Sequence, residues 1–297
     1  MSTTTAPTGR RAAAAANHRD QDTGLTFLRA VHAEWIKLTS LRSSYVILSI
    51  TLLGMIGVGL LSTLAVVDMA SGFAEHGGAV EGSAEQQGMV AEFGMMARDI
   101  PASGIAIAQF LIASLAVMQI GSEYGTRMIT TTLTAVPRRT TAILAKTLVI
   151  AGTSFVVGTV AALISYVVAQ PMLEPQGLKY EVTADGVIPS ILNAGAYLAL
   201  VAILGLGIGA LLRNSAGGIM ATLGLLIVAP IVLAILSGQN ELFMDISRYL
   251  PSSAGTQMVA IRTQPEALTQ TEGGLAMLAW AAAALAGALV TVKRRDA

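Results

Sequence analysis

Residues 43–67 read SSYVILSITLLGMIGVGLLSTLAVV, a stretch of twenty-five residues without one charged side chain. An α-helix rises 1.5 Å per residue, so about 20 apolar residues are enough to cross the hydrocarbon core of a bilayer. This stretch is therefore long enough to span a membrane as a single helix.

Five further uncharged runs of comparable length follow along the chain. They cover residues 100–122, 147–173, 186–212, 214–240 and 273–292. Backbone polar groups in lipid must be bonded within their own segment, which favours helices, and the runs are too long for the strands of a barrel. We predict an all-α, polytopic membrane protein with six transmembrane helices, spanning about residues 45–67, 100–121, 147–170, 187–212, 215–237 and 273–292.

The composition agrees with a membrane protein. Hydrophobic residues make up 54% of the 297 residues and charged residues 12%, with a mean hydropathy of +0.66. Soluble domains carry about 25% charged residues, so this chain cannot cover its surface with polar groups. The chain has no cysteine, and its three histidines lack metal-ligand spacing, so we predict no metal site.

Charge alternates between the segments that connect the runs. The segments before the first, third and fifth runs and after the sixth hold fourteen basic and five acidic residues, and the others hold four and thirteen. The positive-inside rule places the first set in the cytoplasm. Both termini, the segment 123–146 and Arg213 are therefore predicted to be cytoplasmic, and the outer loops 68–99 and 238–272 to lie outside.

The N-terminal region divides into two parts ahead of the six-helix domain of residues 44–295. Residues 1–24 lack apolar periodicity and are predicted to be a disordered tail. Residues 25–43 carry apolar side chains at helical spacing, with Arg29, Glu34 and Lys37 as polar positions. We interpret them as an amphipathic helix in the cytoplasmic interface, with Trp35 at headgroup level and Lys37 near anionic lipid. The alternative is a cytosolic extension of the first span.

The uncharged runs contain no Asp, Glu, Lys, Arg or His, which argues against ion-coupled carriers and most intramembrane enzymes. Gln109, Gln119 and Asn193 are the candidates for a substrate path, although such residues more often hydrogen-bond a neighbouring helix. Gly205 and Gly209 form a GxxxG face, which serves dimerisation and packing within one chain equally well.

The segment 123–146 reads EYGTRMITTTLTAVPRRTTAILAK. Its apolar residues can form a short amphipathic helix that docks in a groove on a partner protein, with arginines that supply hydrogen bonds. The alternative is a basic anchor loop that touches only lipid headgroups. No GxxxxGK[ST] motif occurs, so any ATP-driven activity requires a separate subunit.

Three motifs in this order resemble those of type-2 ABC exporter permeases. AEWIKLTSLRSSYVILSI (residues 33–50) is similar to the Glu-Trp-x-Lys opening of that family, and the acid-aromatic pair that starts segment 123–146 resembles its signature. RYLPSS (residues 248–253) is similar to a Leu-Pro element before the last span. Gly125 follows the acid-aromatic pair directly, whereas the family often has its Gly or Arg later, so the role of Gly125 itself does not carry over.

The resemblance, which covers about residues 27–295, implies a dimer of permeases, each bound to one P-loop ATPase that holds the ATP and Mg²⁺. The chain itself would need no cofactor and would not be an enzyme. Segment 123–146 would be the coupling loop. Glu123 would cap or anchor it, its apolar residues would dock in the ATPase, and Arg138 and Arg139 would pair with acidic residues of the ATPase or with lipid phosphates. The coupling residues implied are Glu123, Tyr124, Thr126, Arg127, Met128, Ile129, Leu133, Pro137, Arg138 and Arg139.

The predicted function is thus the permease of an exporter in the plasma membrane, which moves a hydrophobic or amphipathic substrate out of the cell. The expected partners are the ATPase, a second permease in a homo- or heterodimer, and the lipid bilayer, with no nucleic acid. A membrane scaffold or assembly factor without transport activity is the alternative function.

Overall fold

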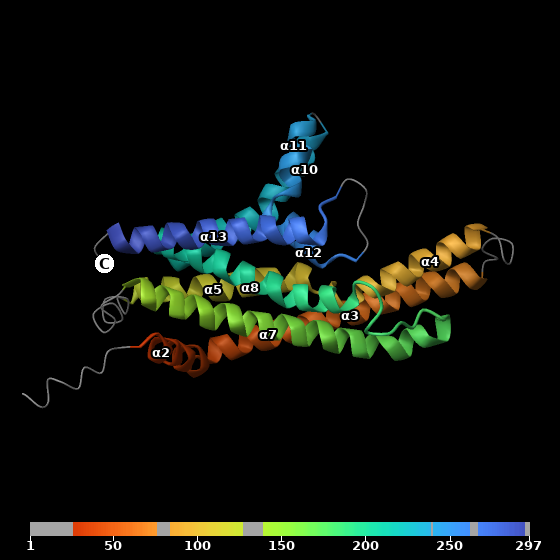
Figure 1. Ribbon diagram of the computed structural model, residues 1–297, viewed down its shortest axis with the longest axis horizontal. Helices are drawn as coiled ribbons and strands as arrows, with labels where there is room; N and C mark the ends of the chain where they lie inside the picture. The colour runs from red at the N-terminus through yellow and green to blue at the C-terminus, as the bar shows by residue number, and fades with distance from the viewer. Residues whose placement is uncertain (1–25, 76–83, 127–138, 239, 262–266, 295–297) are drawn as a thin grey trace, which may run out of the picture.

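Long apolar helices run side by side in the computed structural model of the protein (Figure 1). The structure describes residues 26–75, 84–126, 139–238, 240–261 and 267–294, without the side chains of residues 85, 139, 241 and 294. The predicted tail of residues 1–24 lies outside these ranges. The described residues form helices and turns and no strand, which confirms the all-α prediction.

The helices follow the order of the uncharged runs. The first half of the chain contains α2 (Phe27–Ser40), α3 (Arg42–Glu75), α4 (Ala84–Asp99), the 3₁₀ turn η1 (Ile100–Ala102) and α5 (Ile105–Gly125). The second half contains α7 (Arg139–Leu173), the 3₁₀ turn η2 (Glu174–Gln176), α8 (Val187–Leu212), α9 (Ser215–Leu223), the π-helical η3 (Gly224–Val228), α10 (Ala229–Ser237), α11 (Glu241–Arg248), α12 (Pro251–Val259) and α13 (Gln270–Arg294).

Six helical stretches among the described residues are long and apolar enough to cross a membrane, which confirms the predicted number of spans. They are Arg42–Glu75, Gln86–Gly125, Thr140–Gln176, Val187–Leu212, Ser215–Ser237 and Gln270–Lys293.

Both ends of the described chain lie at the same end of the bundle. In Figure 1, α2, the start of α7 and the last turns of α13 lie together on the left. We call this the basic end, because it carries the segments rich in Lys and Arg, and the opposite end the acidic end. The charge pattern predicts that the basic end faces the cytoplasm.

The segment of residues 25–43 is a helix separate from the first span. α2 ends at Ser40, and Leu41 is extended with φ −90° and ψ 119° before α3 begins at Arg42. α2 packs mainly against α7, so the chain turns at Leu41 instead of continuing the line of α3.

Helix α8 is the central helix of the bundle and contacts α5, α7, α12 and α13. Glycines permit these close approaches: a Cβ on Gly205 would lie 2.9 Å from the carbonyl oxygen of Ala113 in α5, and one on Gly209 would lie 3.3 Å from the Cα of Val117. The GxxxG face therefore packs inside this chain against α5.

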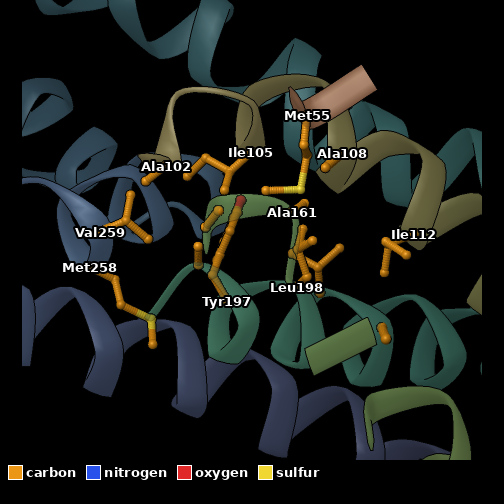
Figure 2. Close-up of a cluster of buried hydrophobic side chains, with 14 of the residues drawn as sticks. Met55, Ala102, Ile105, Ala108, Ile112, Ala161, Tyr197, Leu198, Met258 and Val259 are labelled. Atoms are coloured by element: carbon orange, nitrogen blue, oxygen red, sulfur yellow. The ribbon is translucent and has the colours of Figure 1, made fainter. Parts of the chain in front are cut away.

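Tyr197 of α8 fills the core where α8, α5 and α12 meet. Figure 2 shows its ring among buried side chains, with Met258 and Val259 of α12 on one side and Leu198 and Ala161 on the other. Gly255 of α12 faces the ring, because any Cβ there would overlap it. This contact holds the short helix α12 against the spans near the acidic end.

Replacing Gly207 with alanine is expected to lower the free energy of unfolding by about 1–3 kcal/mol. The new Cβ would lie 2.6 Å from the carbonyl carbon of Ala284, so α8 and α13 would have to separate. Thermal unfolding in mild detergent measures the effect. The control is Gly57→Ala in α3, where a Cβ meets no atom within 4 Å. Equal midpoints for the two variants would contradict this packing.

Candidate functional site

Four charged side chains from three helices meet at the basic end. Lys146 Nζ of α7 donates to Glu34 Oε2 of α2 at 2.5 Å and to Glu123 Oε1 of α5 at 3.0 Å. Lys37 Nζ of α2 donates to Glu34 Oε1 at 2.7 Å and to the same Glu123 Oε1 at 3.0 Å. We call these four residues the ionic cluster. It ties α2 to the end of α5 and the start of α7.

The ionic cluster is almost closed to solvent. Glu34 and Glu123 are 5% exposed and Lys146 is 3% exposed. A charge in such a place costs several kcal/mol unless an opposite charge and hydrogen bonds compensate it. Two acids and two bases meet here, so the cluster is neutral as a whole, and four hydrogen bonds join its members. Both bonds to Glu123 reach Oε1, and its buried Oε2 has no hydrogen-bond partner among the described residues.

Lys37 lies at the rim of the cluster. Burial by itself lowers the pKa of this ammonium, but its hydrogen bond to Glu34 and the charge of Glu123 outweigh that effect. The pKa of Lys37 is therefore raised above its ordinary value, and Lys37 is charged at neutral pH.

The burial of Glu34 follows from the geometry of α2. Ala30, Glu34 and Leu38 are four residues apart, lie on one helix face and form its buried stripe. Leu28 and Trp35 are largely exposed instead. Glu34 was predicted only as a polar position of this helix, and the structure shows that it is buried, with its partners Lys146 on α7 and Lys37 on α2 itself.

The last turns of α5 contact further elements on other sides. Gln119 Nε2 donates to Ser44 Oγ of α3 at 2.9 Å, and both side chains are buried. Gly121 packs against the first residue of α9, since a Cβ there would lie 2.9 Å from the backbone nitrogen of Ser215. The end of α5 is thus held by α3 and α9 as well as by the ionic cluster.

The aromatic residue after Glu123 joins α5 to the turn between α8 and α9. The guanidinium of Arg213 lies 5.3 Å from the ring centroid of Tyr124, a cation–π distance. Arg213 adopts the left-handed conformation (φ 52°) that ends α8, and its backbone N–H donates to the Gly209 carbonyl. Asn214 then caps α9 by accepting a hydrogen bond from the backbone of Gly217.

The structure describes part of the predicted coupling loop. Glu123 and Tyr124 lie in the last turn of α5, and Thr126 closes that helix by donating its backbone N–H and its hydroxyl to the Ser122 carbonyl. Arg139 begins α7. The other predicted coupling residues, Arg127, Met128, Ile129, Leu133, Pro137 and Arg138, lie outside the described residues.

The three predicted path residues all make hydrogen bonds within the chain. Gln109 Oε1 accepts a 2.5 Å hydrogen bond from the Tyr197 hydroxyl, and Asn193 Nδ2 donates to the Met258 carbonyl at 2.8 Å. Gln119 is the partner of Ser44 described above. In this conformation their polar groups connect neighbouring elements, and their role in a path stays a prediction.

The acidic end is held by side-chain-to-backbone hydrogen bonds. Ser190 Oγ donates to the Val259 carbonyl at 2.7 Å, and Asp99 Oδ1 accepts from the Ile261 backbone at 2.8 Å. The Tyr180 hydroxyl donates to the Ala97 carbonyl at 2.9 Å, and burial raises the pKa of this phenol, which keeps it protonated as a donor. α12 and the end of α4 are thereby fixed to the bundle.

The sequence singled out Glu123 and Tyr124 for a coupling loop and Lys37 for a position near anionic lipid, whereas Lys37 is paired with Glu34 and Glu123. It did not indicate that Glu34, Ser44, Lys146 and Arg213 would contact other helices. The available signal was charge placed directly beside the uncharged runs: Glu123 and Lys146 flank the second and third runs, and Arg213 alone separates the fourth and fifth. Within the described ranges, no group of three or more His, Asp or Glu side chains has the geometry of a metal site.

Comparison with protein families identifies the family of this chain. The profile described as "ABC-2 family transporter protein" matches residues 96–291, about two thirds of the chain. The chain belongs to the ABC-2 transporter family. A comparison with curated proteins finds none that matches it.

In this ABC-2 permease, the residues that match the family include only part of the ionic cluster. Glu123, Lys146 and Arg213 lie within the matched residues, whereas α2 with Glu34 and Lys37 precedes them. A helix outside the matched region is thus bonded to the two helices that lead into and out of residues 127–138.

Replacing Lys146 with methionine is expected to lower the free energy of unfolding by about 3–5 kcal/mol, because Glu34 and Glu123 would stay buried without their main counter-charge. Thermal unfolding in detergent checks this, and adding Glu123→Gln should restore part of the loss. The control is Lys179→Met, which removes an exposed ion pair with Glu174 and should change little. A Lys146→Met variant as stable as that control would contradict the importance of the cluster.

Proposed function

We propose that this ABC-2 permease is the membrane subunit of an ATP-driven exporter, coupled to a separate P-loop ATPase at its basic end. Two observations together support the proposal: the chain belongs to the ABC-2 family, and the ionic cluster joins its helices at the basic end. It bonds Glu123, three residues before Thr126, to Lys146, seven residues after Arg139. The two helices that bracket the predicted coupling loop are therefore tied to each other and to α2.

The loop would bind the ATPase through its apolar side chains. In this proposal Met128, Ile129 and Leu133 dock in a groove of the ATPase, and Arg138 and Arg139 pair with its acidic residues. ATP and Mg²⁺ bind to the ATPase, whose closure displaces the loop.

The ionic cluster would carry that displacement into the membrane domain. A displaced loop moves α5 and α7 together only if the ends of these helices cannot slide past each other. The ammonium of Lys146 in α7 opposes such sliding, because it is bonded both to Glu123 of α5 and to Glu34 of α2. The contacts of Gln119 with Ser44 and of Tyr124 with Arg213 extend the connection to α3 and α8. Displacement of one loop would thus tilt most of the bundle.

The exposed fifth span favours a second subunit. In the apolar 18-residue core of Ser215–Ser237, only 11% of the residues are buried within the chain. The corresponding share for Val187–Leu212 is 61%. Lipid or another permease must cover this surface, and in the proposed dimer a second permease covers part of it, with the substrate path between the two.

A path that includes the predicted polar residues requires α12 to move. Gln109 is bonded to Tyr197, which packs on Gly255 of α12, and Asn193 is bonded to the Met258 carbonyl of α12. Displacement of α12 from α8 would free Asn193 and uncover Tyr197 and Gln109. We therefore propose α12 as the exit gate for a hydrophobic or amphipathic substrate.

The test is to purify the tagged chain from its native membrane in mild detergent and to identify its partners by mass spectrometry. A near-stoichiometric P-loop ATPase is expected, and the double variant Arg138→Glu, Arg139→Glu should lose it, because the reversed charges repel the acidic residues of the motor. The control is Lys293→Glu, an exposed charge reversal at the same end of the bundle, which should retain the ATPase.

Two results would contradict the proposal. Partners without any nucleotide motif would favour the scaffold function, and an ATPase retained equally by the double variant would place the contact outside the loop.

A further inference from the structure

An apolar groove runs between α2 and α7 at the basic end. It has a volume of about 550 Å³, within the roughly 300–1,000 Å³ of pockets that hold small ligands. Its walls include Leu28, His32 and Trp35 of α2 and Leu148, Gly152 and Val156 of α7. The described chain leaves this groove unfilled, and neither the family nor the proposed coupling loop accounts for it.

The floor of the groove is open at one glycine. A Cβ on Gly152 would meet no heavy atom within 4 Å, whereas one on Gly158, further along α7, would lie 2.9 Å from the Cα of Gly195 in α8. Gly158 is therefore needed for helix packing, but Gly152 is not. The absence of a side chain at residue 152 leaves space for something outside the chain.

The groove has the dimensions of one membrane leaflet. From Leu148 to Val156 it follows α7 for about 12 Å, close to the roughly 15 Å that one leaflet contributes to the hydrocarbon core. Leu148 and Val156 are 52% and 57% exposed and lie in a span, so they face the acyl region. Trp35, an aromatic residue of the kind that prefers the headgroup level, belongs to the α2 wall of the groove.

The α2 wall of the groove carries basic side chains. His32 lines the groove, and Arg29 precedes it by three residues, the spacing of side-chain neighbours on a helix surface. Among the described residues Arg29 has no acidic partner, while Lys37 and Lys146 are bonded to the two glutamates of the ionic cluster. A cation above an apolar channel matches a molecule with an anionic head and a hydrocarbon tail.

We propose that the groove between α2 and α7 binds an anionic phospholipid of the surrounding bilayer. One acyl chain lies along α7 over Gly152, and the phosphate is held by Arg29 and His32 beside Trp35. The lipid thereby packs on the helix that the ionic cluster ties to α5 and α7. This site is independent of the ATPase and of the exported substrate, so its test needs neither.

The two tryptophans of the chain allow a direct measurement. Trp280 is replaced with phenylalanine, which leaves Trp35 as the only tryptophan, and the protein is reconstituted in bilayers that contain brominated phosphatidylglycerol or brominated phosphatidylcholine. Bromine quenches tryptophan on contact. The quenching of Trp35 should give a binding constant for phosphatidylglycerol about fivefold higher than that for phosphatidylcholine. One Lys or Arg near an anionic membrane surface contributes about 1 kcal/mol, which corresponds to this factor.

Two variants in this background separate head from tail. Arg29→Gln with His32→Gln should remove the preference for phosphatidylglycerol. Gly152→Leu fills the groove and should reduce quenching by both lipids. The matched control is Gly54→Leu in α3, where a Cβ also meets no atom within 4 Å and which should behave as the parent. Native mass spectrometry of chains with both tryptophans should show phosphatidylglycerol retained by the control and lost from Gly152→Leu.

Equal quenching of the parent by the two lipids would overturn the proposal, as would unchanged quenching in Gly152→Leu. Weak quenching by both lipids in the parent would show that a second protein chain covers the groove, and this would overturn it as well.

Discussion

Lys146 carries a charge into a place that water scarcely reaches, and the arrangement of the basic end depends on how that charge is compensated. Its partners come from segments 112 and 23 residues away. Because an uncompensated ammonium would cost several kcal/mol there, α2, α5 and α7 must stay together for the charge to remain buried. The requirement acts on three helices at once and fixes their ends in one arrangement.

The position of this constraint in the chain connects fold to function. The ionic cluster holds the helices on either side of residues 127–138, and the last turns of α5 add contacts to α3, α8 and α9. A force on the loop therefore reaches most of the bundle through bonded contacts rather than through apolar surfaces alone. At the acidic end, by contrast, α12 is held to α8 by hydrogen bonds to its backbone carbonyls and by one ring on a glycine, contacts between uncharged groups.

The fold was largely predictable, because charged side chains are costly inside a bilayer and a long uncharged run therefore indicates a membrane span. Six long uncharged runs correspond to six helical spans, and the turn near Leu41 separates α2 from the first span.

The contacts of the site were less predictable. The periodicity of α2 groups Glu34 with the polar residues of the helix. It carries no information about Lys146, which lies 112 residues further along the chain and pairs with Glu34 in the structure. Residues 68–99 were likewise predicted only as an outer loop, and the return of α4 along α3, with Phe93 edge-on to Phe73, depends on tertiary packing.

In the proposed coupling, the ends of α2 and α5 move as one body when the ATPase closes. The chain has no native cysteine, so spin labels can be placed at Ser40→Cys with Thr126→Cys, and at Thr126→Cys with Lys293→Cys, all on exposed residues. Pulsed electron paramagnetic resonance on the complex with its ATPase, without nucleotide and with trapped ATP, gives both distances. The distance between residues 40 and 126 is expected to stay constant while that between residues 126 and 293 changes. A change between residues 40 and 126 as large as that between 126 and 293 would contradict the proposed coupling.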